Sequence, residues 1–245
     1  MNSLPKWNTV LHRAIRGYTP RQEVIVDEDS KKVMDLATGQ GGTTPNPEAP
    51  APQWHNHIGE LMEYGYPLRH IQALQADTGL HWPEPDKADK AHDALNKAGS
   101  CVILVGPRGT GKTQLATELG LLMYQDEQLT QKYTTLSGLL QQEKDSWNKP
   151  PELDAFNRPT SPLKKAQSVG LLVLDEIQEV ASTDWAMAQL IRLFDARYGD
   201  MKRTILISNL MPEAMEKFVG PSIWSRVTET GLLVLCGGKD WGSFR

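Results

Sequence analysis

Short apolar runs alternate with helix-like stretches over most of the chain. The intervening stretches repeat apolar residues every three or four positions, as amphipathic helices do. Five of the runs predict strands, at residues 101–105, 133–136, 170–174, 204–207 and 232–236. Continuous apolar strands that alternate with helices are typical of a parallel sheet covered on both faces. The pattern therefore predicts an α/β fold with a parallel five-stranded sheet between helices.

The first 53 residues follow a different pattern. Apolar positions at helical spacing occupy the beginning of the chain, but residues 1–38 are too few for a robust independent core. Residues 39–53 are rich in Gly and Pro and are expected to form a linker. We predict a partner-binding arm at 1–38, a linker at 39–53 and one α/β domain at 54–245.

Composition and charge indicate the cellular compartment of the chain and the way it could contact nucleic acid. No apolar run approaches 18 residues, and the first residues lack the apolar core of a signal peptide. The cysteines Cys101 and Cys236 lie in predicted strands and are expected to be buried thiols, which favours a reducing cytoplasm. The net charge of −4 argues against a protein that coats nucleic acid by bulk charge. We expect a cytoplasmic protein without membrane contact.

A glycine-rich phosphate-binding motif follows the first predicted strand. It fits G-x-x-x-x-G-K-[ST] and consists of Gly106, Pro107, Arg108, Gly109, Thr110, Gly111, Lys112 and Thr113. A strand before it and helical periodicity after it are the setting that this P-loop requires. Its backbone N–H groups converge on phosphate oxygens at a helix N-terminus. We expect Lys112 to reach the β- and γ-phosphates and Thr113 to ligate Mg²⁺.

Two carboxylates follow the third predicted strand. Asp175 and Glu176 end an apolar run, which is the Walker B pattern. Asp175 is expected to hold Mg²⁺, and Glu176 is expected to polarise a water for attack on the γ-phosphate. A small-molecule kinase needs no such base, because its nucleophile is the substrate. The pair therefore favours a hydrolase, although acids at a strand end can also be merely solvated.

Three further polar residues are candidates for the same chemistry. Asn209 follows the fourth predicted strand and could orient the attacking water or occupy an ordinary turn. Arg226 could serve as an arginine finger for a neighbouring subunit or form a surface ion pair. Arg245, the last residue, could contact nucleotide or lie exposed.

The order and spacing of these motifs resemble AAA+ ATPases. Only 36 residues follow Asn209, too few for the usual helical lid. This truncated lid, the pair Ser225-Arg226 and the ending Trp-Gly-Ser-Phe-Arg resemble the DnaC/IstB group. Residues 64–69 also resemble the lead-in of that group, so that the resemblance covers about residues 60–245. It leaves the first 53 residues without a counterpart.

The resemblance implies a loader of a replicative helicase. In DnaC-type proteins the N-terminal arm grips the hexameric helicase, and the AAA+ domains assemble on single-stranded DNA. This chain would then form an oligomer in which Arg226 reaches a neighbour's ATP. Two DNA-binding places follow from the resemblance, and they contain Trp147, Lys149, Thr183 and Trp185. Aromatic stacking with scattered cations suits single strands, although both tryptophans could instead pack on neighbouring helices.

Other functions remain open. An IstB-like ATPase would assist a DNA transposase and prefer duplex DNA. A non-hydrolysing adaptor would use nucleotide only to shape an interface. We expect an ATPase that uses ATP and Mg²⁺ in DNA replication and whose slow turnover rises on assembly.

Overall fold

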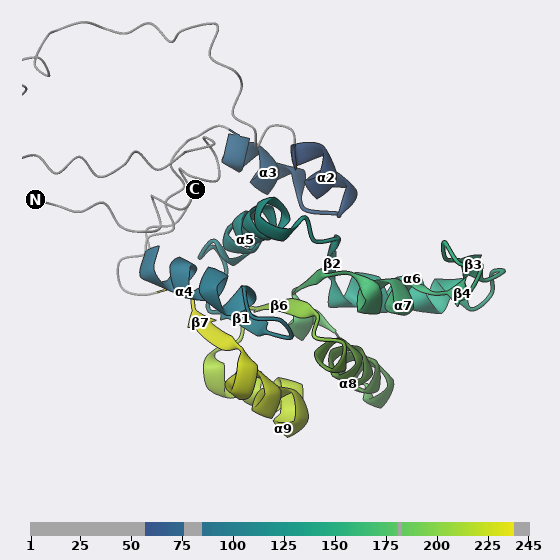
Figure 1. The fold of residues 1–245 in the computed structure, drawn as a ribbon. Coiled ribbons are helices and arrows are strands. Elements are labelled where there is room, and N and C mark those ends of the chain that lie inside the picture. The colour runs from purple at the N-terminus through teal and green to yellow at the C-terminus, as the bar shows by residue number, and fades with distance from the viewer. Residues whose placement is uncertain (1–56, 76–84, 181–182, 238–245) are drawn as a thin grey trace, which may run out of the picture.

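The computed structural model describes residues 57–75, 85–180 and 183–237 (Figure 1). The expected arm at 1–38 and linker at 39–53 lie outside the described residues, as does Arg245. Among the described residues, no helix combines the length and the apolar character needed to cross a bilayer.

A five-stranded sheet forms the centre of the molecule. Its order is β2-β5-β6-β1-β7, and every neighbouring pair is parallel. This confirms the predicted parallel α/β fold. The strands are β1 (Cys101–Val105), β2 (Gln131–Thr135), β5 (Leu171–Asp175), β6 (Arg203–Ser208) and β7 (Leu232–Leu235).

The second strand is shifted from its predicted range. It ends at Thr135, and Leu136 begins helix α6 (Leu136–Ser146) instead of extending the strand. The Thr135 hydroxyl caps that helix by accepting a hydrogen bond from the Gly138 N–H at 3.1 Å. A side-chain cap of this kind stops a strand and starts a helix within one residue.

Two apolar cores lie on the two faces of the sheet. Val102 and Leu104 face the core shared with α4 (Pro85–Leu95) and α5 (Lys112–Glu127). Ile103 and Val105 face the core built with α6 and with α7 (Pro162–Ser168), α8 (Asp184–Gly199) and α9 (Pro212–Thr230). Figure 1 shows these helices on opposite sides of the sheet. Alternate strand residues point to opposite faces, so one strand supplies both cores.

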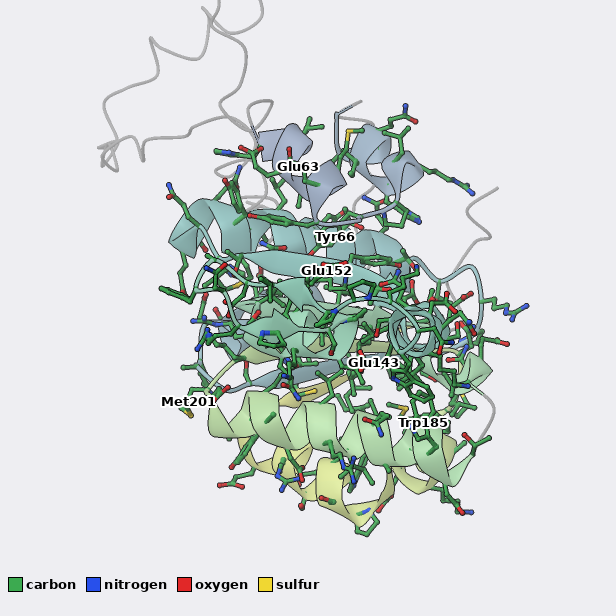
Figure 2. All side chains as sticks on the ribbon, turned by 90° about the vertical axis from the view of Figure 1, so that its right-hand side faces the viewer. Glu63, Tyr66, Glu143, Glu152, Trp185 and Met201 are labelled. Atoms are coloured by element: carbon green, nitrogen blue, oxygen red, sulfur yellow. The ribbon has the colours of Figure 1, made fainter. Side chains whose placement is uncertain are left out.

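A small third layer covers helix α5. It consists of α2 (Ile58–Glu63) and α3 (Leu68–Gln75), joined through Tyr66. The Tyr66 hydroxyl donates to Gln131 Oε1 at 2.6 Å, and Figure 2 shows Tyr66 below these helices. The ring passes so close to Gly120 of α5 that a Cβ there would lie 2.2 Å from the hydroxyl oxygen. Gly120 therefore allows the α2–α3 layer to pack closely against α5.

Three smaller features complete the described fold. A two-stranded hairpin, β3 (Glu152–Leu153) and β4 (Pro159–Thr160), follows α6 and was not predicted. A short helical turn, η4 (Ile177–Glu179), follows β5. Helix α9 is kinked at Gly220, which has a φ of 74° and precedes Pro221. The hairpin escaped prediction because strands of two residues carry no measurable periodicity.

Candidate nucleotide-binding site

The glycine loop lies between β1 and α5, as the sequence predicts. Gly106 has a φ of 132°, and a Cβ at this position would lie 1.9 Å from the carbonyl oxygen of Cys236. Only glycine fits this crossing of two chain segments. Gly111 adopts the left-handed conformation and directly precedes Lys112, where α5 begins. The N-terminus of α5 thus opens onto the loop with its backbone N–H groups available to an anion.

Lys112 is folded against the loop. Its ammonium group donates to the carbonyl oxygens of Gly106 at 2.8 Å and of Pro107 at 2.7 Å. Burial lowers the pKa of Lys112. A buried cation this close to the helix N-terminus provides a strong attraction for phosphate, because little water screens it.

Asp175 lies opposite Thr113 at the end of β5. The Thr113 hydroxyl donates to Asp175 Oδ2 at 3.0 Å, and the Tyr133 hydroxyl donates to the same oxygen. Burial together with the Asp175 carboxylate raises the pKa of Tyr133, so this phenol remains a donor. Sequence reasoning missed Tyr133, although its position on β2 beside β5 was a usable signal.

A hydroxyl and a carboxylate in contact fit Mg²⁺, which prefers hard oxygen ligands. Thr113 and Asp175 supply these two oxygens, and the remaining positions would fall to phosphate and water. The part of the chain that the structure describes has no cluster of three or more His, Cys, Asp or Glu side chains suited to a metal. The site thus suits an ion that arrives with a phosphate ligand.

Glu176 adopts an unusual backbone conformation beside Asp175. Its φ of 50° places it in the left-handed region, which is strained for a residue with a Cβ. Its backbone N–H donates to Asp175 Oδ1 at 2.7 Å, and its side chain is exposed at the pocket. Glu176 thus lies at the pocket, next to Asp175.

Asn209 borders the same pocket from the end of β6. Its backbone N–H donates to Gln178 Oε1 at 3.1 Å, and the Ser208 hydroxyl donates to the same oxygen at 2.9 Å. Gln178 therefore joins the turn after β5 to the end of β6. The structure brings Asp175, Glu176 and Asn209 together at this pocket.

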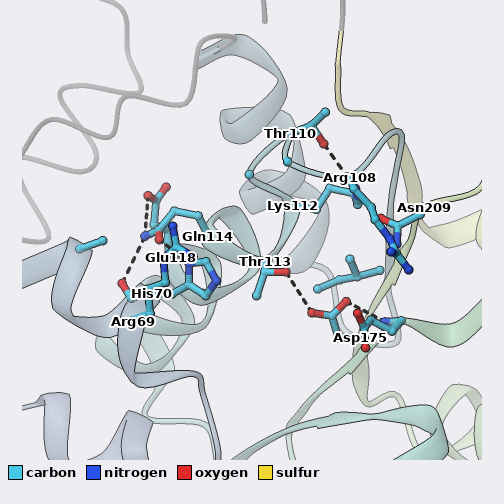
Figure 3. A pocket seen from close by; sticks show the side chains of 15 residues that line it. Arg69, His70, Arg108, Thr110, Lys112, Thr113, Gln114, Glu118, Asp175 and Asn209 are labelled. Atoms are coloured by element: carbon cyan, nitrogen blue, oxygen red, sulfur yellow. Dashed lines mark hydrogen bonds between the residues drawn. The ribbon is translucent and has the colours of Figure 1, made fainter. Parts of the chain in front are cut away.

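One pocket of about 370 Å³ is lined by residues 108–113 together with Asp175, Glu176 and Asn209, and it continues beyond them (Figure 3). Its second end lies between α3 and α5, with Arg69, His70, Gln114 and Glu118 in its wall. His70 Nδ1 lies 2.8 Å from Gln114 Oε1. Sequence reasoning missed this end of the pocket. Gln114 and Glu118 stand one helical turn apart immediately after the P-loop, which was the available signal.

Glu118 is a buried acid at this second end. It is 2% exposed, and its Oε2 has no hydrogen-bond partner. Gln114 Nε2 donates to its other oxygen at 3.4 Å. Burial raises the pKa of Glu118 to about 8, whereas the hydrogen bond from Gln114 acts in the opposite direction. Desolvation thus outweighs the single hydrogen bond.

Arg226 is absent from the pocket of its own chain. It lies on α9, where its Nη1 contacts Asp195 Oδ1 at 2.5 Å and the Ser222 hydroxyl at 2.9 Å. Its guanidinium also lies 5.4 Å from the centre of the Tyr198 ring. Arg226 therefore contacts α8 and its own helix instead of the pocket.

The two expected DNA-binding places meet on one surface. The rings of Trp147 and Trp185 lie edge to face with centroids 5.7 Å apart, and the Lys144 ammonium lies 4.8 Å from the Trp185 ring centre. Trp147 is 61% exposed, whereas Trp185 is partly buried. Lys149 is exposed, and the Thr183 hydroxyl caps α8 by accepting from the Ala186 N–H. Figure 2 places Trp185 at the outer end of its helix.

Comparison with known sequences gives two matches. A family model described as an AAA domain of the dynein-related subfamily matches residues 101–219. The uncharacterized protein YdaV of Escherichia coli (strain K12) is 30% identical over 126 residues, which are 51% of this chain and 48% of that protein. The match thus spans about half the length of this curated relative.

Comparison with solved structures identifies the fold. The DnaC helicase loader superposes with a TM-score of 0.52 at 20% identity, over 62% of this chain and 88% of that chain. Domain III of the Thermotoga maritima replication initiation protein DnaA gives 0.52 at 19% identity, over 64% and 63%. DnaI gives 0.50 at 15% identity, over 69% and 89%. The chain shares the AAA+ P-loop fold of these proteins, which confirms the predicted fold class.

Proposed function

We propose that this AAA+ protein is an ATPase that loads a replicative helicase onto single-stranded DNA. The observation that carries the ATPase proposal is the convergence of the glycine loop, Thr113, Asp175, Glu176 and Asn209 on one pocket. Phosphoryl transfer to water requires a phosphate-binding loop, oxygen ligands for the metal, a general base and a polar group that positions the water.

Binding would begin at the loop. Backbone N–H groups of residues 108–113 would hold the phosphates, and the Lys112 ammonium would exchange its two loop carbonyls for β- and γ-phosphate oxygens. The Thr113 hydroxyl and the Asp175 carboxylate hold Mg²⁺. When bound, the ion neutralises charge on the phosphate oxygens.

Hydrolysis would follow by in-line attack of water. Glu176 accepts a proton from the water while Asn209 orients it. A bond forms between the water oxygen and the γ-phosphorus. The bond from that phosphorus to the β–γ bridging oxygen breaks, and its electron pair leaves with ADP. The proton on Glu176 then passes to solvent or phosphate, so that ATP and water become ADP and inorganic phosphate.

Assembly would complete the site. Arg226 contacts Asp195 and does not line its own pocket, as expected of a finger supplied in trans. We infer an oligomer in which each Arg226 reaches the neighbour's γ-phosphate. ATP would then act mainly as an assembly signal, and hydrolysis would release partner and DNA.

Two observations support the proposed helicase partner and the proposed DNA binding. The fold is shared with structures named as the DnaC helicase loader and DnaI. The exposed Trp147 ring, beside Trp185 and Lys144, offers a stacking surface with a nearby cation, which suits single-stranded DNA. In this proposal the partner is the hexameric helicase, gripped by the arm at residues 1–38.

Nucleotide binding is tested by Lys112→Ala. Because this side chain supplies the buried cation next to the loop, its loss should abolish binding of a fluorescent ATP analogue to the full chain. Thermal unfolding monitors folding, and Lys217→Ala, which removes an exposed lysine from α9, serves as the matched control. Tight binding by Lys112→Ala would refute the P-loop role.

The loader role is tested by co-elution with a replicative helicase in ATP. We expect a stoichiometric complex on a sizing column, and Lys112→Ala should weaken it. A variant lacking residues 1–53 that retains its unfolding transition should lose the complex. Absence of any complex, together with a preference for duplex over single-stranded DNA, would favour an ATPase that assists a transposase.

A further inference from the structure

Arg108 is the third residue of the glycine loop and has no assigned task for its side chain. The loop binds phosphate through its backbone, so this position does not require arginine. The side chain is 76% exposed and borders the nucleotide pocket. In Figure 3 it extends from the loop on the side of the pocket that also carries Asn209 and Asp175.

A single carboxylate holds the Arg108 guanidinium. Its Nη2 contacts Glu179 Oε1 at 2.9 Å, and Glu179 lies on the turn η4, just beyond Glu176. Gln178 Nε2 donates to the same Glu179 oxygen at 3.2 Å, while Gln178 Oε1 accepts from the Asn209 N–H. The guanidinium therefore sits at the end of a hydrogen-bond chain that leads to the water-positioning residue.

The charged groups around the pocket favour pairing of the Arg108 guanidinium with a phosphate. This end of the site has three carboxylates, those of Asp175, Glu176 and Glu179, whereas the Lys112 ammonium donates to the loop carbonyls. An exposed ion pair such as Arg108–Glu179 is worth little. A phosphate accepts two parallel hydrogen bonds from a guanidinium and carries more negative charge than one carboxylate. A γ-phosphate at the loop would therefore compete successfully for Arg108.

We propose that Arg108 is a catalytic cation supplied by the chain to its own ATP. On binding, its guanidinium leaves Glu179 and pairs with γ-phosphate oxygens, where it stabilises the charge that shifts during attack by water. Arg226 of a neighbour adds a second cation. This inference rests on the proposed ATPase function, and it implies measurable turnover before subunits assemble.

Arg108→Ala in the full chain tests the role of the side chain. ADP lacks the γ-phosphate, so its affinity should stay unchanged while the affinity for a non-hydrolysable ATP analogue falls about tenfold. Turnover should fall about 100-fold at saturating ATP, as when one transition-state donor is removed. Arg108→Lys should recover part of the affinity but little of the rate, because it lacks the planar fork. Arg192→Ala, at an exposed position on α8, is the control.

Glu179→Ala tests the competition from the other side. Without its carboxylate, Arg108 no longer has to leave a partner, so affinity for the ATP analogue should rise a few-fold while that for ADP stays constant. A wild-type chain that binds neither nucleotide would refute the ATPase proposal itself. The role of Arg108 alone would be overturned by a different result. In that case the wild-type chain hydrolyses ATP, and Arg108→Ala lowers the affinities for ADP and for the ATP analogue equally or lowers neither.

Discussion

Arg197 and Glu118 are both buried, but their surroundings satisfy them unequally. Arg197 donates to several carbonyl oxygens, among them those of Ala166 at 2.7 Å and Val169 at 2.9 Å. It thereby ties α7 and the start of β5 to α8 and β6. Glu118 keeps one oxygen without a partner inside the fold. A buried acid with incomplete hydrogen bonding destabilises the folded state when it ionises.

Glu118 predicts a pH-dependent stability. Burial raises its pKa from 4.5 to about 8, so between these values the folded chain keeps a proton that the unfolded chain has lost. The contribution of Glu118 to the free energy of unfolding therefore decreases as pH rises through this window. Glu118→Gln should stabilise the chain by about 1–3 kcal/mol at pH 8 and by less at pH 5.

Denaturant unfolding at the two pH values measures this effect. Glu216→Gln, at an exposed position on α9, should show no comparable pH-dependent gain. An equal effect of Glu118→Gln at both pH values would mean that Glu118 is ionised in the folded chain across the whole range.

At the scale of elements, α6 and α8 bring two tryptophans together. The end of α6 carries Trp147 and the first turn of α8 carries Trp185, and the edge-to-face contact leaves the Trp147 ring open to solvent. Sequence reasoning treated them as two separate places with packing as the alternative. The contact is compatible with both packing and stacking. Trp185 is partly buried, and it can support the exposed Trp147 ring for stacking.

Trp147→Ala is expected to weaken single-stranded DNA binding without unfolding the chain. Loss of one base–aromatic stack costs about 1–3 kcal/mol. Trp185→Ala should lower both DNA affinity and thermal stability, and the double variant should lose less than the sum because the rings touch. Binding to a labelled oligothymidine and thermal unfolding measure the two effects, with the exposed Met201→Ala as control. Unchanged DNA affinity in both single variants would assign the pair to packing.

At the scale of the whole molecule, the residues of the proposed ATPase lie in two separate places. The pocket holds Lys112, Asp175 and Glu176, while Arg226 lies on α9 against Asp195. In the proposed oligomer, one subunit would supply the ATP pocket and its neighbour would supply Arg226. Under that proposal, turnover would depend on how subunits are arranged.

Mixing two variants that each lack assembly-dependent hydrolysis tests this division. Arg226→Ala should bind ATP normally but lose assembly-dependent hydrolysis, whereas Glu176→Gln should bind ATP but fail to activate water. In a mixture, the intact site of one variant can meet the intact finger of the other, so part of the activity should return. Failure to recover any activity, despite mixed assemblies on a sizing column, would argue against a finger in trans.

The amino-acid sequence by itself determined the features that depend on neighbouring residues. The glycine loop, the strand before it, the helix after it and the acidic pair Asp175-Glu176 were all predictable. Each is specified within a short segment by backbone preference and hydrophobic period. Because parallel strands direct their carboxyl ends to one edge, the meeting of these segments also followed from the fold class.

Only the tertiary structure decided which distant side chains touch. Arg108 meets Glu179 across 71 positions, and His70 meets Gln114 across 44. The contact of Trp147 with Trp185 and the hydrogen bond of Arg226 with Asp195 also arise from tertiary packing. These pairs depend on helix packing angles and turn conformations, which no periodicity in one segment records. The local sequence pattern thus defined the glycine-loop end of the pocket. Tertiary packing defined the end between α3 and α5 and the carboxylates that pair with Arg108 and Arg226.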